Sequence, residues 1–468
     1  MLKFLRNLLC VILTFVLLLS GVSAADVSVS REQLDATGKY CYETIGEPEF
    51  GAEWFLYCFQ ASGYNVPASY RRGYYSALEQ TVKARKGVLD ERKYTEYSRT
   101  VLALTALGYD PTDVGGYDLL QPLSDFEGTI RQGLNGAVFA LLALDGGNYA
   151  IPKAEDGKVQ ATRGKYIGYI TEHQLPDGGF TYSGSRSDHD MTAMVLQALA
   201  KYRGRPDVER AIGKAINYLS AGQHANGGFD NWGTENCESC AQVILALCEL
   251  GIPVDDARFV KEGNTPLDVL LSYRQTDGSF AHLPGGGTNM LATRQAYMAL
   301  TSLWRIKNGK SSFFTLDFSP VFRDTSGDPN RMEIDELARA GMISGRGDGT
   351  YDPGATMTRA EFASLIVRAI GVKPETVGVF RDVSKDAWYA PYVGAAWRSG
   401  IVRGISDDCF APDNTITVSE AEVMVARTAR LLGLEPTTGE TWYPTTVLIT
   451  RGEMAQMLYG LLSEAGLL

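Results

Sequence analysis

Histidine and cysteine are scarce in this chain, which has 4 His and 7 Cys among its 468 residues. Neither a G-x-S-x-G nor an H-E-x-x-H motif occurs, and no P-loop is present. The sequence therefore gives no support for a serine hydrolase, a zinc protease or a P-loop nucleotide-binding protein. The formal net charge is −11, and no block of Lys or Arg offsets it. An acidic chain of this kind is a poor partner for nucleic acid or an anionic membrane surface.

The only long apolar run lies at the N-terminus. It extends from Leu8 to Leu19, follows Lys3 and Arg6, and leads into small residues that end at Ala24. This order of features predicts a secretory signal peptide over residues 1–24. No later stretch of about 18 apolar residues occurs, so we expect no transmembrane segment. The mature chain is predicted to be secreted.

Cysteine also limits the covalent framework. Once Cys10 leaves with the signal peptide, too few cysteines remain to build a disulfide scaffold of this length. The pairs nearest in sequence are Cys41 with Cys58 and Cys237 with Cys240, and the sequence leaves open whether either pair is bonded. A single C-x-x-C without a second pair gives little support for structural zinc.

Two phrases repeat within a helical region that spans residues 31–306. The first is an apolar helix with a central alanine, and the second is a turn of Asp or Asn, Gly and an aromatic residue that precedes the last three of these helices. Repeats of this length must stack on one another to bury their apolar faces. Six helical hairpins could close into a ring. The alanines are Ala61, Ala106, Ala143, Ala198, Ala246 and Ala299, and the turn glycines are Gly178, Gly227 and Gly278.

The turns QLPDGGF (174–180), QHANGGF (223–229) and RQTDGSF (274–280) resemble those of squalene–hopene cyclases and of protein prenyltransferase β subunits. The resemblance implies an all-α chain in which residues 25–306 form an (α/α)6 toroid, terpenoid cyclase/prenyltransferase-like. It implies less about activity, because one ring can carry unrelated functions.

The character of the sequence changes after a linker at 307–320. Two segments that open with Phe322-Arg323-Asp324 and Phe380-Arg381-Asp382 resemble S-layer homology (SLH) repeats. We expect repeat 1 at 321–375, repeat 2 at 379–435 and a partial repeat 3, without its first helix, at 441–464. The toroid would thus be followed by a small helical SLH-repeat module.

Each SLH repeat contains a T-x-x-E motif, which is typical of a helix capping box. Capping explains Thr and Glu but not the arginine of the first and third motifs, Arg359 and Arg451; the second motif has Val418 instead. In SLH domains this arginine contacts acidic groups of a secondary cell-wall polymer on the peptidoglycan, and the resemblance implies that role here. A guanidinium at a helix start suits a carboxylate. Trp388 could stack on a sugar or pack in the core.

Asp188-His189-Asp190-Met191-Thr192-Ala193 resembles the D-x-D-D-T-A motif of the cyclases. The match places Asp190 at the proton-donating aspartate and Asp188 at the first aspartate, so these are the candidate catalytic residues. Met191 replaces the third, which belongs to the network that tunes the acid. The alternative is that Asp188 caps a helix and Asp190 complements its dipole, and we favour that alternative.

The zinc site of the prenyltransferases is matched poorly. Glu238 and Cys240 occupy its D-x-C positions, but Ala292 stands where a histidine is expected and His282 lies in the turn. Glu238 and Cys240 are therefore weak metal candidates, and we expect neither a metal nor another cofactor.

The starts of the alanine-centred helices are polar, and in a closed ring they would converge at one end of the lumen. We therefore expect an unknown ligand there, although caps alone would also make helix starts polar. Three functions stay open: a wall-anchored protein with a non-catalytic binding toroid, a cyclase-like enzyme that uses Asp190, and a purely structural surface protein. The lumen candidates are Arg99, Asn135, Asp188, Asp190, Glu235, Glu238, Arg294 and Gln295.

Overall fold

The computed structural model describes residues 28–316, 321–326, 328–436 and 445–468. The expected signal peptide at 1–24 lies outside these residues. The regular secondary structure of the described chain is helical apart from short bridges and one two-stranded sheet of β1 (Asp230–Asn231) and β2 (Thr234–Glu235), so the all-α prediction is confirmed. No helix in the described ranges is long and apolar enough to cross a membrane. The chain divides into two compact units.

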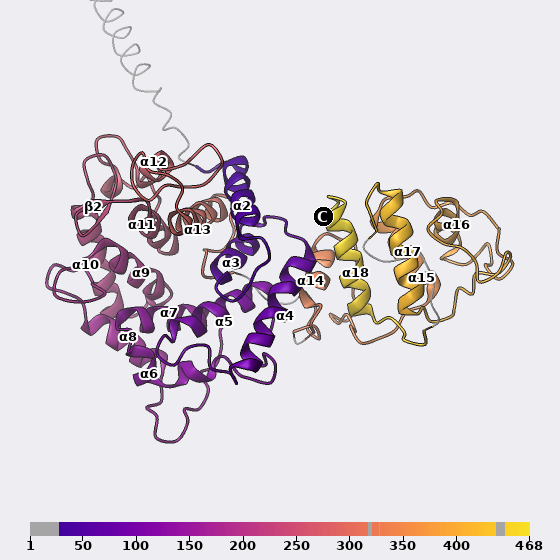
Figure 1. Ribbon diagram of the computed structural model, residues 1–468, viewed down its shortest axis with the longest axis horizontal. Helices are drawn as coiled ribbons and strands as arrows, with labels where there is room; N and C mark the ends of the chain where they lie inside the picture. The colour runs from indigo at the N-terminus through magenta and orange to yellow at the C-terminus, as the bar shows by residue number, and fades with distance from the viewer. Residues whose placement is uncertain (1–27, 317–320, 327, 437–444) are drawn as a thin grey trace, which may run out of the picture. The chain divides into compact units, whose positions relative to one another are not determined.

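Unit 1 comprises Met1–Thr44, Asp125–Asp145 and Ala154–Leu316. Its consecutive odd-numbered helices pack side by side, α9 against α11 and α11 against α13 (Figure 1). Ala198, Ala246 and Ala299 are buried in these helices, where a small side chain allows close approach. The helices of this part of the chain are α2 (Arg31–Ile45), α6 (Phe126–Ile130), α7 (Leu134–Gly146), α8 (Arg163–Glu172), α9 (His189–Leu199), α10 (Pro206–Gly222), α11 (Cys237–Glu249), α12 (Pro266–Ser272) and α13 (Met290–Lys307), with the 3-10 helices η2 (Ala200–Tyr202) and η3 (Ala257–Phe259).

The three glycine turns fix how the repeats of unit 1 meet. Gly178, Gly227 and Gly278 have φ angles of 91°, 92° and 89°, and a Cβ on any of them would lie within 3.0 Å of a backbone oxygen. Only glycine tolerates both the left-handed backbone and this approach. For Gly278 the neighbour is Ala36 of α2, and the Thr37 hydroxyl donates a hydrogen bond of 2.9 Å to the Gly278 carbonyl. The last turn thus packs on α2, at the other end of the toroid sequence.

Unit 2 comprises Ile45–Ser124, Gly146–Lys153 and Asp317–Leu468. Helix α3 packs on α5, and Ala61 and Ala106 are buried in them, which completes the expected set of six alanine-centred helices. The helices of this part of the chain are α3 (Glu53–Ser62), α4 (Ala68–Ala84), α5 (Thr95–Leu107), α14 (Arg331–Arg339), α15 (Arg359–Ala369), α16 (Ala390–Arg398), α17 (Val418–Leu431) and α18 (Arg451–Glu464), with the 3-10 helix η1 (Gln121–Ser124).

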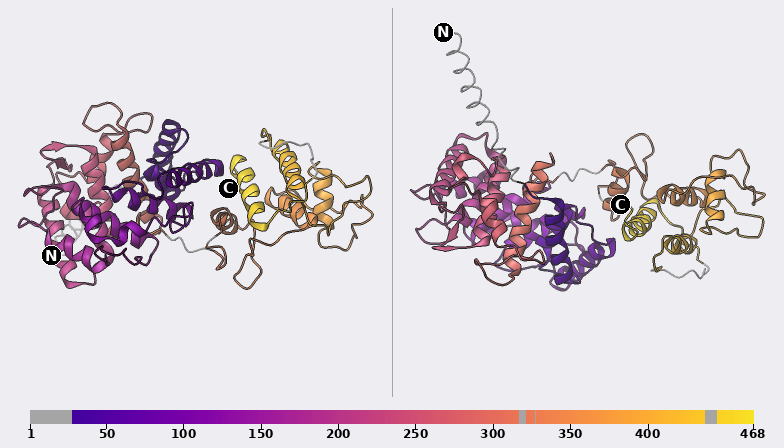
Figure 2. Two further views of the ribbon diagram at one scale, coloured as in Figure 1. Left: turned by 60° about the horizontal axis from the view of Figure 1, so that its bottom comes forward. Right: turned by 90° about the horizontal axis from the view of Figure 1, so that it is seen from above.

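Helices α15, α17 and α18 each begin within a T-x-x-E motif, directly after its threonine. Each motif forms a capping box. Backbone bridges join their starts in cyclic order: Thr358 to Thr415, Thr417 to Leu448, and Thr450 to Thr356. Helices α17 and α18 pack on each other (Figure 1), and Figure 2 shows this C-terminal part of the chain from two further sides. Helix α14 packs on α18, and α16 packs on α15. In the sequence between α17 and α18, the described residues contain no helix.

Candidate functional site

Arg359 begins α15 and points into the module. Its Nε donates to the Phe410 carbonyl at 3.0 Å, its Nη1 lies 2.7 Å from Glu420 Oε1, and its guanidinium lies 5.0 Å from the Phe410 ring centroid. The residue is 5% exposed, and burial lowers the pKa of its guanidinium while the Glu420 carboxylate opposes that change. The side chain is therefore held in one orientation before any ligand binds.

A cavity of about 340 Å³ opens beside Arg359. Two further arginines, Arg403 and Arg427, line the same cavity, so basic residues of the first and second repeats share one space with Glu420. This arrangement suits an anionic group, because a planar guanidinium binds a carboxylate through two parallel hydrogen bonds. The lining residues are Arg359, Arg403, Gly404, Ile405, Glu420, Val423, Met424 and Arg427.

Neither Arg403 nor Arg427 was predicted from the sequence as a site residue. Arg403 lies in a loop and belongs to no motif that we recognised. Arg427 carried a usable signal, because it follows Glu420 by seven residues, which is two helical turns and places it on the same helix face.

Arg451, at the start of α18, contacts a backbone carbonyl and an aromatic ring as Arg359 does. Its Nε donates to the Tyr351 carbonyl at 2.9 Å, and its guanidinium lies 4.4 Å from the Tyr351 ring centroid. Its Nη2 lies 3.3 Å from the Ser344 carbonyl. The third helix, α17, begins with Val418 and has no arginine at this position.

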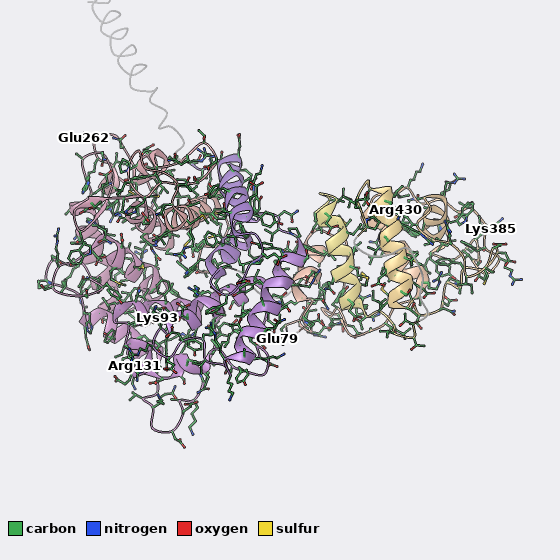
Figure 3. All side chains as sticks on the ribbon, in the orientation of Figure 1. Glu79, Lys93, Arg131, Glu262, Lys385 and Arg430 are labelled. Carbon is green, nitrogen blue, oxygen red and sulfur yellow. The ribbon has the colours of Figure 1, made fainter. Side chains whose placement is uncertain are left out.

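Trp388 is 61% exposed, so core packing does not account for it. Its ring meets Tyr389 edge-on, with 5.4 Å between centroids. An exposed indole beside a second aromatic ring offers an apolar face on the surface. Basic side chains are also exposed on this module, and Figure 3 labels Lys385 and Arg430 among them.

Asp188 and Asp190 take different positions at the start of α9. Asp188 is the N-cap, and its Oδ1 accepts from the Met191 backbone N–H at 2.7 Å. Asp190 lies in the first turn, where its Oδ2 accepts from Asn231 Nδ2 at 2.6 Å. Burial raises the pKa of the Asp190 carboxyl, and hydrogen bonds from Ser239 and Asn231 oppose the rise. Met191, at the position of the third acid of the motif, is itself buried and supplies no carboxylate there.

Several of the other lumen candidates of unit 1 have partners of their own, and their convergence in one lumen stays a prediction. Glu235 pairs with His224 at 2.9 Å, and Glu238 pairs with His282 at 2.8 Å. Gln295 accepts from Gln242, which in turn accepts from Gln197, so one amide from each of α9, α11 and α13 joins a chain. Asn135 is the second residue of α7 and Arg294 is the fifth residue of α13.

Arg99 belongs to unit 2 and is engaged there. Its Nε lies 2.7 Å from Oε2 of the fully buried Glu53, and its Nη2 contacts Glu96. Tyr74 donates a further hydrogen bond of 3.1 Å to Glu53. Arg99 therefore neutralises a buried carboxylate, which accounts for its position at a helix start.

The two weak metal candidates, Glu238 and Cys240, are in states that do not favour metal binding. Glu238 binds His282, and burial raises the pKa of the Cys240 thiol to about 12, so this thiol stays protonated near neutral pH. Cys41, Cys237 and Cys240 form no disulfide bond. Within the described ranges, no group of three or more His, Cys, Asp or Glu residues is placed to hold a metal ion.

Comparison with known families divides the chain in two. A family model described as "Prenyltransferase alpha-alpha toroid domain" matches residues 131–319, and one described as "S-layer homology domain" matches residues 321–363 and 379–421. The toroid fold and the presence of SLH repeats are thereby confirmed, whereas the partial third repeat at 441–464 and the domain bounds stay predictions.

The similar curated proteins are bacterial surface proteins. The middle cell wall protein of Brevibacillus brevis is 34% identical over 126 residues, which are 26% of this chain and 12% of that protein. The surface layer protein of Brevibacillus choshinensis is 36% identical over 114 residues, which are 23% of this chain and 10% of that protein. The chain thus spans about a tenth of the length of these relatives.

Among solved structures, the protein geranylgeranyltransferase-I of Candida albicans, complexed with GGPP, is similar with a TM-score of 0.43 and 13% identity, covering 60% of this chain and 95% of that one. A type II terpene cyclase from Scytonema gives a TM-score of 0.37 and 14% identity, covering 58% of this chain and 96% of that one.

Proposed function

We propose that this cell-surface, S-layer-associated protein, which joins a prenyltransferase alpha-alpha toroid domain to SLH repeats, is held on the wall by a secondary cell-wall polymer bound to those repeats. The observation that carries the proposal is the cavity beside Arg359. An acidic sugar substituent would enter this cavity and bind Arg359, Arg403 and Arg427. Arg451 offers a second contact of the same chemistry, and Trp388 offers a sugar-stacking face.

The cavity is prepared for an anion even though the whole chain is acidic. Glu420 and the Phe410 carbonyl already fix Arg359, so binding need not order that side chain. Arg403 is exposed and free to close on the ligand without disturbing the core. Attraction between several guanidinium groups and an anion weakens as salt is added. Anchoring should therefore weaken at high ionic strength.

Arg403→Glu tests this proposal, because Arg403 is exposed and its replacement leaves the packing around Arg359 unchanged. We expect roughly tenfold weaker binding of the full chain to purified sacculi that carry their polymer. Co-sedimentation at two salt concentrations measures the effect. Arg398→Glu is the matched control, because Arg398 is exposed on α16 and pairs with Glu375 away from the cavity. Equal loss in both variants, or in neither, would contradict the proposal.

The same proposal gives the toroid a non-catalytic role as a ligand-binding module. Asp188 serves as a cap, Asp190 is bound by Asn231, and Met191 occupies the place of the third acid. Protonation of an alkene needs a strong acid kept protonated by neighbouring acids, and only one candidate acid is left.

One observation favours the alternative of a cyclase-like enzyme. The Asp190 carboxyl is largely buried, and its raised pKa favours the protonated form that a proton donor needs. The cyclase alternative thus rests on Asp190 alone. The non-catalytic role agrees with Asp188, Asp190 and Met191 together.

A further inference from the structure

Three loops of unit 1 lead from the glycine turns into α9, α11 and α13, and we call them the rim loops: residues 181–188, 230–236 and 281–289. They hold three of the six large apolar side chains that unit 1 exposes among its described residues. Tyr182, Trp232 and Leu283 lie in the three loops, and Leu291 follows in the first turn of α13. The exposed large apolar residues of unit 1 are Val159, Tyr182, Trp232, Leu283, Leu291 and Ile306.

Trp232 has an unfavourable backbone conformation. It forms, with Gly233, the two-residue turn between β1 and β2, and the φ angles of the two residues are 52° and 88°. Turns with positive φ at both positions favour Asn, Asp or Gly, and a bulky residue there is strained. The ring is nevertheless 58% exposed, so core packing does not repay this strain. Strain of this kind is commonly kept where a side chain serves a function.

Polar groups surround the indole. The Arg186 guanidinium, from the loop before α9, lies 5.8 Å from the Trp232 ring centroid. Asn231, the residue before Trp232, binds the Asp190 carboxylate. The neighbours along the chain are small or polar, in TYSGSRSD (181–188) and DNWGTEN (230–236). Trp232 therefore stands beside a cation and among small or polar chain neighbours, and the other exposed apolar side chains of the rim come from separate loops.

We propose that the rim loops bind a glycan chain of the cell envelope that is uncharged or carries amino groups, with a sugar ring stacked on Trp232; this rests on the proposed anchoring at the wall. A pyranose ring has a face of C–H groups bordered by hydroxyls, so it matches an exposed indole surrounded by amide, guanidinium and carboxylate groups. A protein partner would instead need a well-packed apolar centre, which a few exposed side chains from separate loops do not provide.

The charge of the rim distinguishes its ligand from that of the SLH module. Arg186 is the only Lys or Arg within 181–190, 230–238 and 281–291. Five acidic residues accompany it, so an anionic polymer is repelled here, whereas the cavity beside Arg359 attracts one. The two sites thus accept different components of one wall. The acidic residues are Asp188, Asp190, Asp230, Glu235 and Glu238.

Trp232→Asn separates this binding from folding. Asparagine followed by Gly233 is the preferred sequence for this turn, so the variant should melt at the same temperature as the wild type or higher. The probe is sacculi treated with hydrofluoric acid, which removes phosphodiester-linked wall polymers. We expect the wild-type full chain to co-sediment with treated sacculi and Trp232→Asn to bind about tenfold more weakly. Val159→Asn, at an exposed residue outside the rim, should bind as the wild type does.

The outcomes also separate this inference from the anchoring itself. Trp232→Asn should still bind untreated sacculi through the SLH repeats, and added salt should weaken that binding more than binding to treated sacculi. Failure of the wild type to bind treated sacculi, or equal binding by Trp232→Asn, would overturn the rim site and leave anchoring intact. Failure of the wild type to bind untreated sacculi would instead contradict the anchoring.

Discussion

At the scale of single residues, Asp188 and Asp190 show how position decides what a carboxylate does. Asp188 ends an extended segment and accepts a backbone N–H of α9, so its charge is stabilised there. Asp190 lies two residues later and is largely enclosed, so its charge is costly. The sequence supplied both candidates, but their burial depends on Asn231 and Ser239, which lie more than 40 residues away in the chain.

Asp190→Asn should stabilise the protein at neutral pH more than in acid. The pKa of Asp190 is higher in the folded state than in the unfolded state, so the wild type loses stability as pH rises through the folded pKa. An amide does not titrate and escapes this loss. Melting temperatures at pH 7 and near pH 4 measure the effect. A difference between variant and wild type that is the same at both pH values would contradict the assignment.

At the scale of elements, the three capping boxes of the SLH module are alike in sequence but unequal in their contacts. Glu361 and Glu453 return to the N–H groups of Thr358 and Thr450. Glu420 does the same for Thr417 and also pairs with Arg359. One carboxylate thus caps α17 and neutralises a buried arginine of α15.

Glu420→Ala should therefore destabilise the chain more than Glu361→Ala does. Loss of a cap costs about 1 kcal/mol, which is all that we expect for Glu361→Ala. Glu420→Ala also leaves Arg359 buried without its ion-pair partner, which raises the cost to roughly 3 kcal/mol. Urea unfolding of both variants checks the difference, and equal costs would show that the Arg359 pair adds nothing to stability.

The sequence predicted the elements better than their contacts. All six alanine-centred helices form, because apolar spacing and helix propensity are local properties. The hairpin of β1 and β2 was not predicted, because Trp232 stands where a turn of this kind usually has Asn. The partners of Arg359 were also missed, since Phe410 and Glu420 lie 51 and 61 residues away. The domain boundaries and the site assignments stay predictions.

At the scale of the whole molecule, unit 2 contains helices from both sides of the expected linker at 307–320. Helix α4 packs on α18, and the Arg71 guanidinium lies 5.0 Å from the Tyr459 ring centroid. Glu333 of α14 is 3% exposed and lies 3.5 Å from Arg72. Burial raises the pKa of the Glu333 carboxyl, while Arg71 and Arg72 oppose the rise. These contacts couple α4 to the SLH helices within the unit.

Arg71→Met should lower the stability of unit 2 by about 2 kcal/mol, because it removes a buried cation from both Tyr459 and Glu333. Arg72→Met is the control: Arg72 is more exposed and should cost under about 1 kcal/mol. Scanning calorimetry of the full chain should show the larger shift for Arg71→Met. A larger shift for Arg72→Met would contradict this expectation and would show that Arg72, not Arg71, couples α4 to the SLH helices.

The contact between Thr37 and Gly278 joins residues 241 positions apart. A chain that crosses the membrane N-terminus first delivers α2 long before the turn on which α2 docks. If export keeps pace with synthesis, that interval is on the order of tens of seconds. During this time the surface of α2 that meets Gly278 has not yet gained this contact. The closing contact of the toroid can therefore form only after the last repeat has arrived.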